Sequence, residues 1–557
     1  MGRATLILTG AFVASRVLGL LRTSMFAFVF GTTHTSDAYL QAFLVPDLIF
    51  NIVAGGALSS AFIPVFAKYM TSERDERTAW HVASSALNLA VAIMIVLALL
   101  AIIFAPFIVP LYNPCPSPCI MKDHLQQLGL ITNLTRIMLL QSIVLGGGVI
   151  INAVLNARQD FKLPAIGTVL YNVGLIIGLV PGIILAFGNQ RNDIFAVYAA
   201  TWGVVFGALL QVGVQIPGLI NVGMRYTFSF DWRHPGVIQI GRQMVPRIVN
   251  ATMLYASIFV DRSLILLLGV VIIDPTLREQ VVGGLITQYY QALQLVLLPL
   301  GIFGMAMSTA AFPTIAEYVA KGRMDRARGI ILETLRSIIF MSIPSSVGLM
   351  VLSLPIVQTL LQHGRFNLQS AYNTSVPLTF FAIGLAGLAS AEILTRSFYA
   401  MRESVTPVMV SIGQFILKIA LSLLFIDVAV FGVQWGLGAL AFATSIAGLL
   451  EATVLLWLLH QRIGGLIQRS LLVFISRVLL ASVVMGIGIF IIRLLLDFLL
   501  RTDHNRLGFG DTFFLLIKLM IEIFVGFLIY IRTARWLGVE ELGPIRRLLD
   551  RLRLTWI

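Results

Sequence analysis

The chain has 557 residues, of which 58% are hydrophobic and only 12% are charged, and its mean hydropathy is +0.92. A soluble domain carries roughly 25% charged residues, so these values exclude a water-soluble globular enzyme. The net charge is +13, but the cations stand between apolar runs and not in the dense stripes of a nucleic-acid-binding domain. Because the apolar runs are continuous, as in LNLAVAIMIVLALLAIIFAPFIV, a transmembrane β-barrel is also excluded. The composition predicts an all-α polytopic membrane protein.

Apolar runs separated by charged or Gly-, Pro- and Asn-rich stretches predict fourteen transmembrane helices. The first run continues past Phe30, contains Arg16 and Arg22, and lacks a convincing cleavage site, so it is interpreted as a retained span and not a signal peptide. The predicted spans are residues 4–30, 37–67, 82–112, 127–155, 164–187, 194–220, 237–271, 281–319, 329–361, 370–400, 407–429, 433–460, 470–499 and 511–534.

The lysines and arginines between the spans are distributed unevenly. With the N-terminus placed inside, the inner connections and the two ends hold 22 of them, against 6 on the outer connections. Since cytoplasmic loops carry an excess of Lys and Arg, both termini are predicted to be cytoplasmic. The tail at 537–557 is predicted to be an amphipathic helix whose arginines face anionic lipids, with a solvated flank of the last span as the alternative.

Two pairs of similar segments indicate an internal duplication. SSAFIPVFAKY at 59–69 aligns with STAAFPTIAEY at 308–318, an offset of 249 residues. NARQDFKLP at 156–164 aligns with YAMRESVTP at 399–407, an offset of 243 residues. Two similar offsets in the same order match spans 1–6 with spans 7–12, and both copies begin inside, so the repeat is parallel.

This duplication predicts two pseudo-symmetric six-helix lobes followed by two added helices. Two such bundles enclose a central cavity that opens to either side by rocking. The predicted parts are an N-lobe at 1–230, a C-lobe at 231–465, spans 13 and 14 at 466–536, and the cytoplasmic tail at 537–557.

Charged residues inside apolar spans are costly, so each is a candidate for function. Arg16 and Arg22 in the first span are six residues apart, about 9 Å along a helix, so both can line one wide cavity wall. Asp37 stands near the outer end of the second span, where it either caps that helix or faces the cavity.

The seventh span contains Asp261 and Arg262, which place both signs of charge in an apolar helix. Lys418 in the eleventh span needs a counter-ion or a neutral form, and Asp261 is the candidate partner. A structural salt bridge unrelated to transport is the alternative interpretation.

Catalysis finds little support in the sequence. The seven histidines stand at or beyond the span ends without an HExxH motif, and no GxxxxGK[ST] phosphate loop exists. We therefore expect a transporter without a metal or cofactor, driven by an ion gradient, the membrane potential or consumption of its substrate. Cys115 and Cys119, on an outer connection, allow a small disulfide-bridged loop, and two free thiols or a weak metal contact are the alternatives.

Several segments resemble one known family. SRVLGLLRTSMFAFVFG at 15–31, followed by SDAYLQAFLVPDLI and GGALSSAFIPVFAKY, is similar to the opening of the MurJ/MviN lipid II flippases of the multidrug/oligosaccharidyl-lipid/polysaccharide exporter superfamily. The likeness continues through LLPLGIFGMAMSTAAFPTIAEY at 297–318, LLQHGRF at 360–366 and FYAMRESVTPV at 398–408. The resemblance implies a bacterial cell-membrane protein that moves an undecaprenyl-pyrophosphate-linked disaccharide-pentapeptide outward by alternating access, for peptidoglycan synthesis and cell shape.

The resemblance also implies roles for single residues. Arg16 and Arg22 match cavity arginines that hold the pyrophosphate, and Asp37 matches an aspartate to which we assign a part in gating. Spans 13 and 14 would shape a groove for the lipid tail. The sequence departs from the family at Phe50-Asn51 and at Gln294, where the family often carries arginines.

A second departure concerns a sodium site. Asp261 resembles a sodium-site aspartate of some members, but the residues that would complete the site are Lys418 and Ser422. We therefore predict that the Lys418 ammonium takes the sodium position and that no sodium site is present.

The expected partners are the lipid-linked glycopeptide, anionic lipids and cell-wall synthesis enzymes, with no nucleic acid. Two alternative functions stay open: a drug or polysaccharide exporter of the same superfamily, and a transport-inactive scaffold paralogue in cell-wall assembly.

Overall fold

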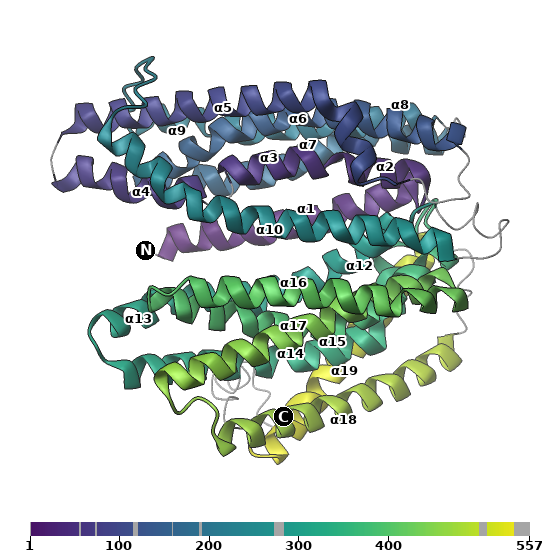
Figure 1. Cartoon of the computed structure of the whole chain (residues 1–557). Coiled ribbons are helices and arrows are strands. Elements are labelled where there is room, and N and C mark those ends of the chain that lie inside the picture. The colour runs from purple at the N-terminus through teal and green to yellow at the C-terminus, as the bar shows by residue number, and fades with distance from the viewer. Residues whose placement is uncertain are drawn as a thin grey trace. The chain divides into compact units, whose positions relative to one another are not determined.

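A computed structural model describes residues 2–54, 57–72, 75–114, 121–158, 160–188, 192–271, 283–500 and 509–539 (Figure 1). These residues form helices and connecting turns and contain no strand, which confirms the predicted all-α fold. The chain divides into two compact units: unit 1 is Met1–Leu266 with Val282–Thr287, and unit 2 is Leu267–Val281 with Gln288–Ile557. The lobe boundary between residues 230 and 231, deduced from the sequence repeat, stays a prediction.

Unit 1 is a bundle built around three clusters of buried apolar side chains. Within it α5 packs on α6, α7 on α8, and α6 on α8. Its helices are α1 (Gly2–Phe30), α2 (His34–Ala42), α3 (Leu44–Ala54), α4 (Ala57–Ala67), the π-helical η1 (Lys68–Ser72), α5 (Glu76–Leu111), α6 (Met121–Ala157), α7 (Lys162–Phe187), α8 (Asp193–Gly213), α9 (Ile216–Asn221) and most of α10 (Pro235–Val271).

Glycines bring α7 and α8 into backbone contact. Gly174 and Gly178 are one turn apart on α7, and Gly203 and Gly207 are one turn apart on α8. A Cβ added at Gly174 would lie 2.3 Å from the Gly207 Cα, and one at Gly178 would lie 2.6 Å from the Gly203 Cα. In a bilayer no hydrophobic driving force holds helices together. Close van der Waals packing at such paired small residues stabilises the α7–α8 contact instead.

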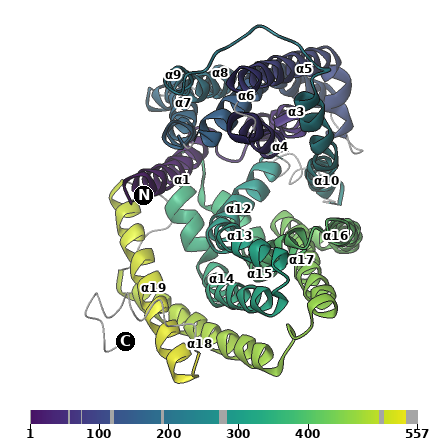
Figure 2. The same cartoon turned by 90° about the vertical axis from the view of Figure 1, so that its left-hand side faces the viewer.

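Unit 2 repeats this packing, with α14 on α15, α16 on α17, and α15 on α17. The added helices α18 and α19 pack on each other and on α14, as Figure 2 shows. Its elements are α12 (Leu285–Pro299), the π-helical η2 (Leu300–Ala306), α13 (Met307–Ala320), α14 (Met324–Leu361), α15 (Leu368–Ala400), α16 (Val405–Phe425), the 3-10 helix η3 (Ile426–Phe431), α17 (Val433–Ile463), α18 (Arg469–Leu500) and α19 (Phe509–Trp536).

Helix boundaries confirm the internal repeat. Helix α6 ends at Ala157 and α15 at Ala400, while α7 begins at Lys162 and α16 at Val405. Both pairs of boundaries differ by 243 residues, the offset of the aligned sequence segments. The two copies therefore break and restart their helices at equivalent residues.

Eleven helices of the described residues are long and apolar enough to cross a membrane, against fourteen predicted spans. The three others correspond to α1, to α2–α4 and to α10. The second predicted span, residues 37–67, is not one helix, because Pro46 cannot donate the backbone hydrogen bond that would join α2 to α3. These three regions are also the ones in which the sequence places its candidate charges, apart from Lys418.

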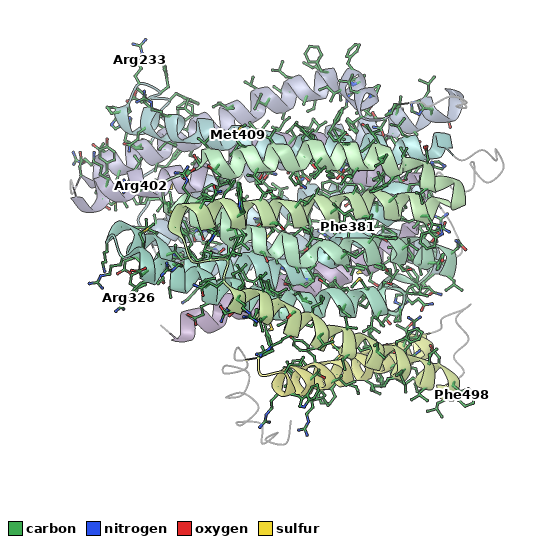
Figure 3. All side chains as sticks on the ribbon, turned by 60° about the horizontal axis from the view of Figure 1, so that its bottom comes forward. Arg233, Arg326, Phe381, Arg402, Met409 and Phe498 are labelled. Carbon is green, nitrogen blue, oxygen red and sulfur yellow. The ribbon has the colours of Figure 1, made fainter. Side chains whose placement is uncertain are left out.

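The cationic connections of unit 2 lie at one end of its bundle. In Figure 3, Arg326 and Arg402 project from one end of the bundle, and Phe498 lies at the opposite end. Successive helices alternate in direction, so the turns after α13, α15 and α17 share the first end and hold Lys321, Arg323 and Arg469 as well. This is the distribution from which a cytoplasmic face is inferred.

Candidate functional site

The break between α2 and α3 leaves backbone carbonyls at the end of α2 available, and Arg262 of α10 donates hydrogen bonds to two of them. Its guanidinium Nη1 donates to the Gln41 carbonyl at 2.9 Å and its Nη2 to the Leu40 carbonyl at 3.1 Å. The Thr135 hydroxyl donates to the next carbonyl, that of Ala42, at 3.4 Å. Arg262 is 6% exposed, so its charge is buried against the negative end of the α2 dipole. Arg262 thus ties α10 to α2.

Asp37 binds the beginning of α12. Its Oδ2 accepts from the Gly284 N–H at 2.9 Å, and its Oδ1 accepts from the Thr287 N–H at 2.8 Å and the Thr287 hydroxyl at 2.7 Å. All three residues belong to unit 1, and Asp37 is only 2% exposed. The N-cap of its own helix is Thr33, so Asp37 caps α12 and not α2. We call these contacts the Asp37 latch.

The two arginines of α1 differ in environment. Arg16 is exposed and follows Ser15, whose hydroxyl accepts a hydrogen bond from the Asn172 side chain at 3.3 Å, which joins α1 to α7. Arg22 is half-buried and lies within electrostatic range of the Tyr39 and Tyr171 hydroxyls. The structure therefore places Arg22 in a polar group and Arg16 on an exposed helix face.

Tyr171 connects Arg22 to further polar residues. Its hydroxyl donates to Gln141 Oε1 at 3.0 Å, and the Asp47 carboxylate acts on the same hydroxyl electrostatically. Asp47 is also within range of the Arg262 guanidinium. Electrostatic interactions thus link Arg22, Asp47, Tyr171 and Arg262 within unit 1, and we call these four residues the Arg22 cluster. Tyr171 is not among the site residues predicted from the sequence, although a tyrosine in the middle of an apolar span is a recognisable signal.

Asn51, which stands where the family often has an arginine, has a structural role here. Its amide donates to the Tyr255 hydroxyl and, at 2.9 Å, to the Asp47 carbonyl. These bonds join α3 to α10. The second position of this kind, Gln294, is exposed on α12 in unit 2.

The residues predicted to form a buried pair belong to different units. Asp261 lies on α10 in unit 1, and Lys418 lies on α16 in unit 2, 5% exposed. Ser422, one turn after Lys418, is 1% exposed. Their pairing stays a prediction. Cys115 and Cys119 lie outside the described residues, as does the tail from residue 540.

In the turns outside the spans, Asp75 and His363 have lowered pKa values. Hydrogen bonds from the Thr78 hydroxyl and N–H lower the pKa of Asp75, which caps α5. Burial lowers the pKa of His363, in the turn between α14 and α15 at the end of unit 2 opposite its cationic connections. His363 is therefore neutral at pH 7, which adds to the difference in positive charge between the two ends of unit 2. No group of three metal-ligating side chains occurs among the residues described.

Comparison with known proteins gives relatives of one kind. The lipid II flippase MurJ of Burkholderia cenocepacia is 28% identical over 417 residues, 74% of this chain and 75% of the relative. The probable lipid II flippase MurJ of Buchnera aphidicola subsp. Acyrthosiphon pisum is 27% identical over 480 residues, 86% and 87% of the two chains.

Solved structures share the fold. A lipid II flippase MurJ in an inward closed conformation superimposes with a TM-score of 0.72 at 24% identity, covering 98% of this chain and 100% of that chain. An inward-facing multidrug resistance MATE family transporter gives a TM-score of 0.62 at 16% identity, covering 81% and 95%. The family model "Lipid II flippase MurJ" matches residues 26–502, which is most of the chain. The chain belongs to the MurJ lipid II flippase family.

Proposed function

We propose that this protein moves lipid II, the undecaprenyl-pyrophosphate-linked disaccharide-pentapeptide, from the cytoplasmic to the outer leaflet of the bacterial cell membrane. The observation that carries the proposal is the family match over residues 26–502. Both termini face the cytoplasm in this proposal, and for the C-terminus the supporting observation is that the cation-rich connections of unit 2 lie at the end where α19 finishes. The protein is a transporter, and its work is alternating access without covalent chemistry.

In this function the α1 arginines bind the pyrophosphate. A pyrophosphate crossing a bilayer must exchange water for fixed cations, and guanidinium groups offer paired donors to its oxygens. Arg22 stands half-buried in the polar Arg22 cluster, and Arg16 is exposed about 9 Å further along the helix. The Asp37 latch gates the pathway by holding or releasing the first turn of α12.

Rescue of cells depleted of their own lipid II flippase tests the proposal. We expect this gene to restore growth and to restore the appearance of lipid II on the outer leaflet. If the protein inserts at a normal level but growth and outward lipid II do not return, the exporter or the scaffold paralogue becomes the better assignment.

We also propose that transport does not require sodium. Lys418 is buried beside Ser422 on α16, so a sodium ion in that position would face an ammonium group that repels it. The thermal stability of the purified protein should be the same in sodium and choline buffers of equal ionic strength. A marked stabilisation by sodium alone would contradict this.

A further inference from the structure

A cavity in unit 2 contains four charged side chains that the proposed transport does not use. It has a volume of about 250 Å³ and lies between α14, the start of α15, α18 and α19. We call it the α14–α19 cavity. Five apolar side chains contribute to its wall, and the charged groups are Arg493, Asp497, Lys518 and Glu522.

The charged groups are only partly satisfied by one another. Lys518 Nζ donates a hydrogen bond to Asp497 Oδ1 and lies 3.9 Å from Glu522 Oε1. Glu522 is completely buried, yet neither of its carboxylate oxygens accepts a hydrogen bond from the described residues. The buried Thr359 hydroxyl in the same wall also has no such partner. A buried carboxylate without donors is costly, and the Lys518 ammonium, at 3.9 Å, is too far from Glu522 to donate a hydrogen bond to it, so the Glu522 carboxylate lacks a donor that carries positive charge.

Arg493 can bind an anion, whereas Glu522 needs a cationic donor. Its Nη1 donates to the Val351 carbonyl at 3.1 Å, and its Nε is 3.8 Å from Asp497 Oδ2. The side chain is 25% exposed, and a guanidinium has five N–H groups, so it retains capacity for an anion. Two cations and two carboxylates give the wall a formal charge of zero. A complementary ligand would carry both charges and be neutral overall.

The level of the cavity in the membrane points to a lipid. Helix α18 has 32 residues and is therefore about 48 Å long, about 18 Å more than the hydrocarbon core of a bilayer. Centred on the core, it extends about 9 Å beyond each side, and Arg493 is about 10 Å from its end. In that placement Arg493 lies near the boundary between hydrocarbon and headgroups. Phe498 lies beyond Arg493 at the same end of α18 (Figure 3), and its side chain is 79% exposed.

We propose that the α14–α19 cavity binds the phosphoethanolamine headgroup of a phospholipid, with the primary ammonium on Glu522 and the phosphate on Arg493. The ammonium supplies the N–H donors that the Glu522 carboxylate lacks. A phosphocholine headgroup has the same charges but no N–H donors, and a phosphoglycerol headgroup has no cation. The site thus discriminates by hydrogen bonding and by charge.

A lipid series on the wild-type protein tests the discrimination. The delipidated full chain is titrated with phosphatidylethanolamine, its mono- and dimethyl derivatives, phosphatidylcholine and phosphatidylglycerol, and bound lipid is counted by native mass spectrometry. Affinity should fall with each methyl group, and phosphatidylcholine and phosphatidylglycerol should bind about 10-fold more weakly than phosphatidylethanolamine, the effect of about one charge-assisted hydrogen bond. Equal affinities for the five lipids would overturn the proposal, whatever the variants do.

Variants assign the discrimination to residues. Glu522→Gln should bind phosphatidylethanolamine and phosphatidylcholine equally, whereas Arg493→Gln should weaken both by a similar factor. The matched control is Glu451→Gln, since Glu451 is a half-buried glutamate of α17 that accepts a hydrogen bond from Ser411 at 2.7 Å. It should retain the wild-type preference. If Glu522→Gln keeps the preference, exclusion by headgroup size explains it and the assignment to Glu522 is wrong.

Discussion

Replacing Arg22 with alanine is expected to abolish rescue of flippase-depleted cells while the protein accumulates in the membrane at the wild-type level. Arg22 is half-buried within electrostatic range of Tyr39 and Tyr171, and a cation interacts more strongly with a phosphate where water is partly excluded. Each charge-assisted hydrogen bond to the pyrophosphate is worth about 1.5–3 kcal/mol, or roughly 10- to 150-fold in binding. The measurement is growth together with outward lipid II. Arg16→Ala should weaken rescue less, because Arg16 is exposed.

Two further variants make this result specific. Arg22→Lys keeps the charge but loses the paired donors, so rescue should be intermediate. Arg225→Ala removes an exposed arginine of the segment before α10 and should rescue fully. Full rescue by Arg22→Ala would favour the scaffold, because a scaffold does not bind pyrophosphate.

Replacing Asp37 with alanine is expected to release the first turn of α12 and to abolish rescue. The variant leaves the N–H groups of Gly284 and Thr287 without an acceptor in a buried site, at roughly 1–3 kcal/mol for each. Asp37→Asn retains one acceptor and should have a smaller effect. The apparent Tm of the purified protein should fall by several degrees for Asp37→Ala and less for Asp37→Asn.

Cysteine labelling separates release of the latch from general loss of stability. Ile286 and Val204 are both 0% exposed in unit 1, and Ile286 lies within the latch. In a background with Cys115 and Cys119 replaced by serine, Asp37→Ala should accelerate maleimide labelling of Ile286→Cys but not of Val204→Cys. Equal acceleration at both positions would mean that Asp37 only stabilises the fold. Asp75→Ala, which removes an exposed cap of α5, should change neither rate.

The sequence was sufficient to predict the helices, their order and the repeat. Apolar runs that are long enough for a bilayer leave little choice of secondary structure, and paired segments such as those around Pro164 and Pro407 mark equivalent helix starts. The second span was the exception. Pro46 is visible in the sequence, but a proline in a membrane helix can be accommodated, and the sequence does not show that Thr135 and Arg262, both far along the chain, bind the carbonyls at the end of α2.

The partners of the candidate site residues could not be predicted for a similar reason. Asp37 looked equally suited to capping its own helix, and only the fold brings it to Gly284 and Thr287. Likewise, the sequence marks Glu522 as one of several charges near the end of the chain, and its lack of hydrogen-bond donors becomes visible only when α18 and α19 pack. The sequence pattern identifies charged residues whose burial in an apolar span is costly. Packing between segments far apart in the chain determines which groups form hydrogen bonds with them.

Because α12 starts in the Asp37 latch and continues into unit 2, it can act as a lever held at one end. Its 15 residues span about 22 Å, so a rotation of about 10° at the latch would displace its far end by about 4 Å. Pro299 and the π-helical Leu300–Ala306 follow at that end, where the wider turns allow bending. Three hydrogen bonds to one carboxylate could therefore control movement several helical turns away, and stiffening η2 should slow transport without altering any residue that binds substrate.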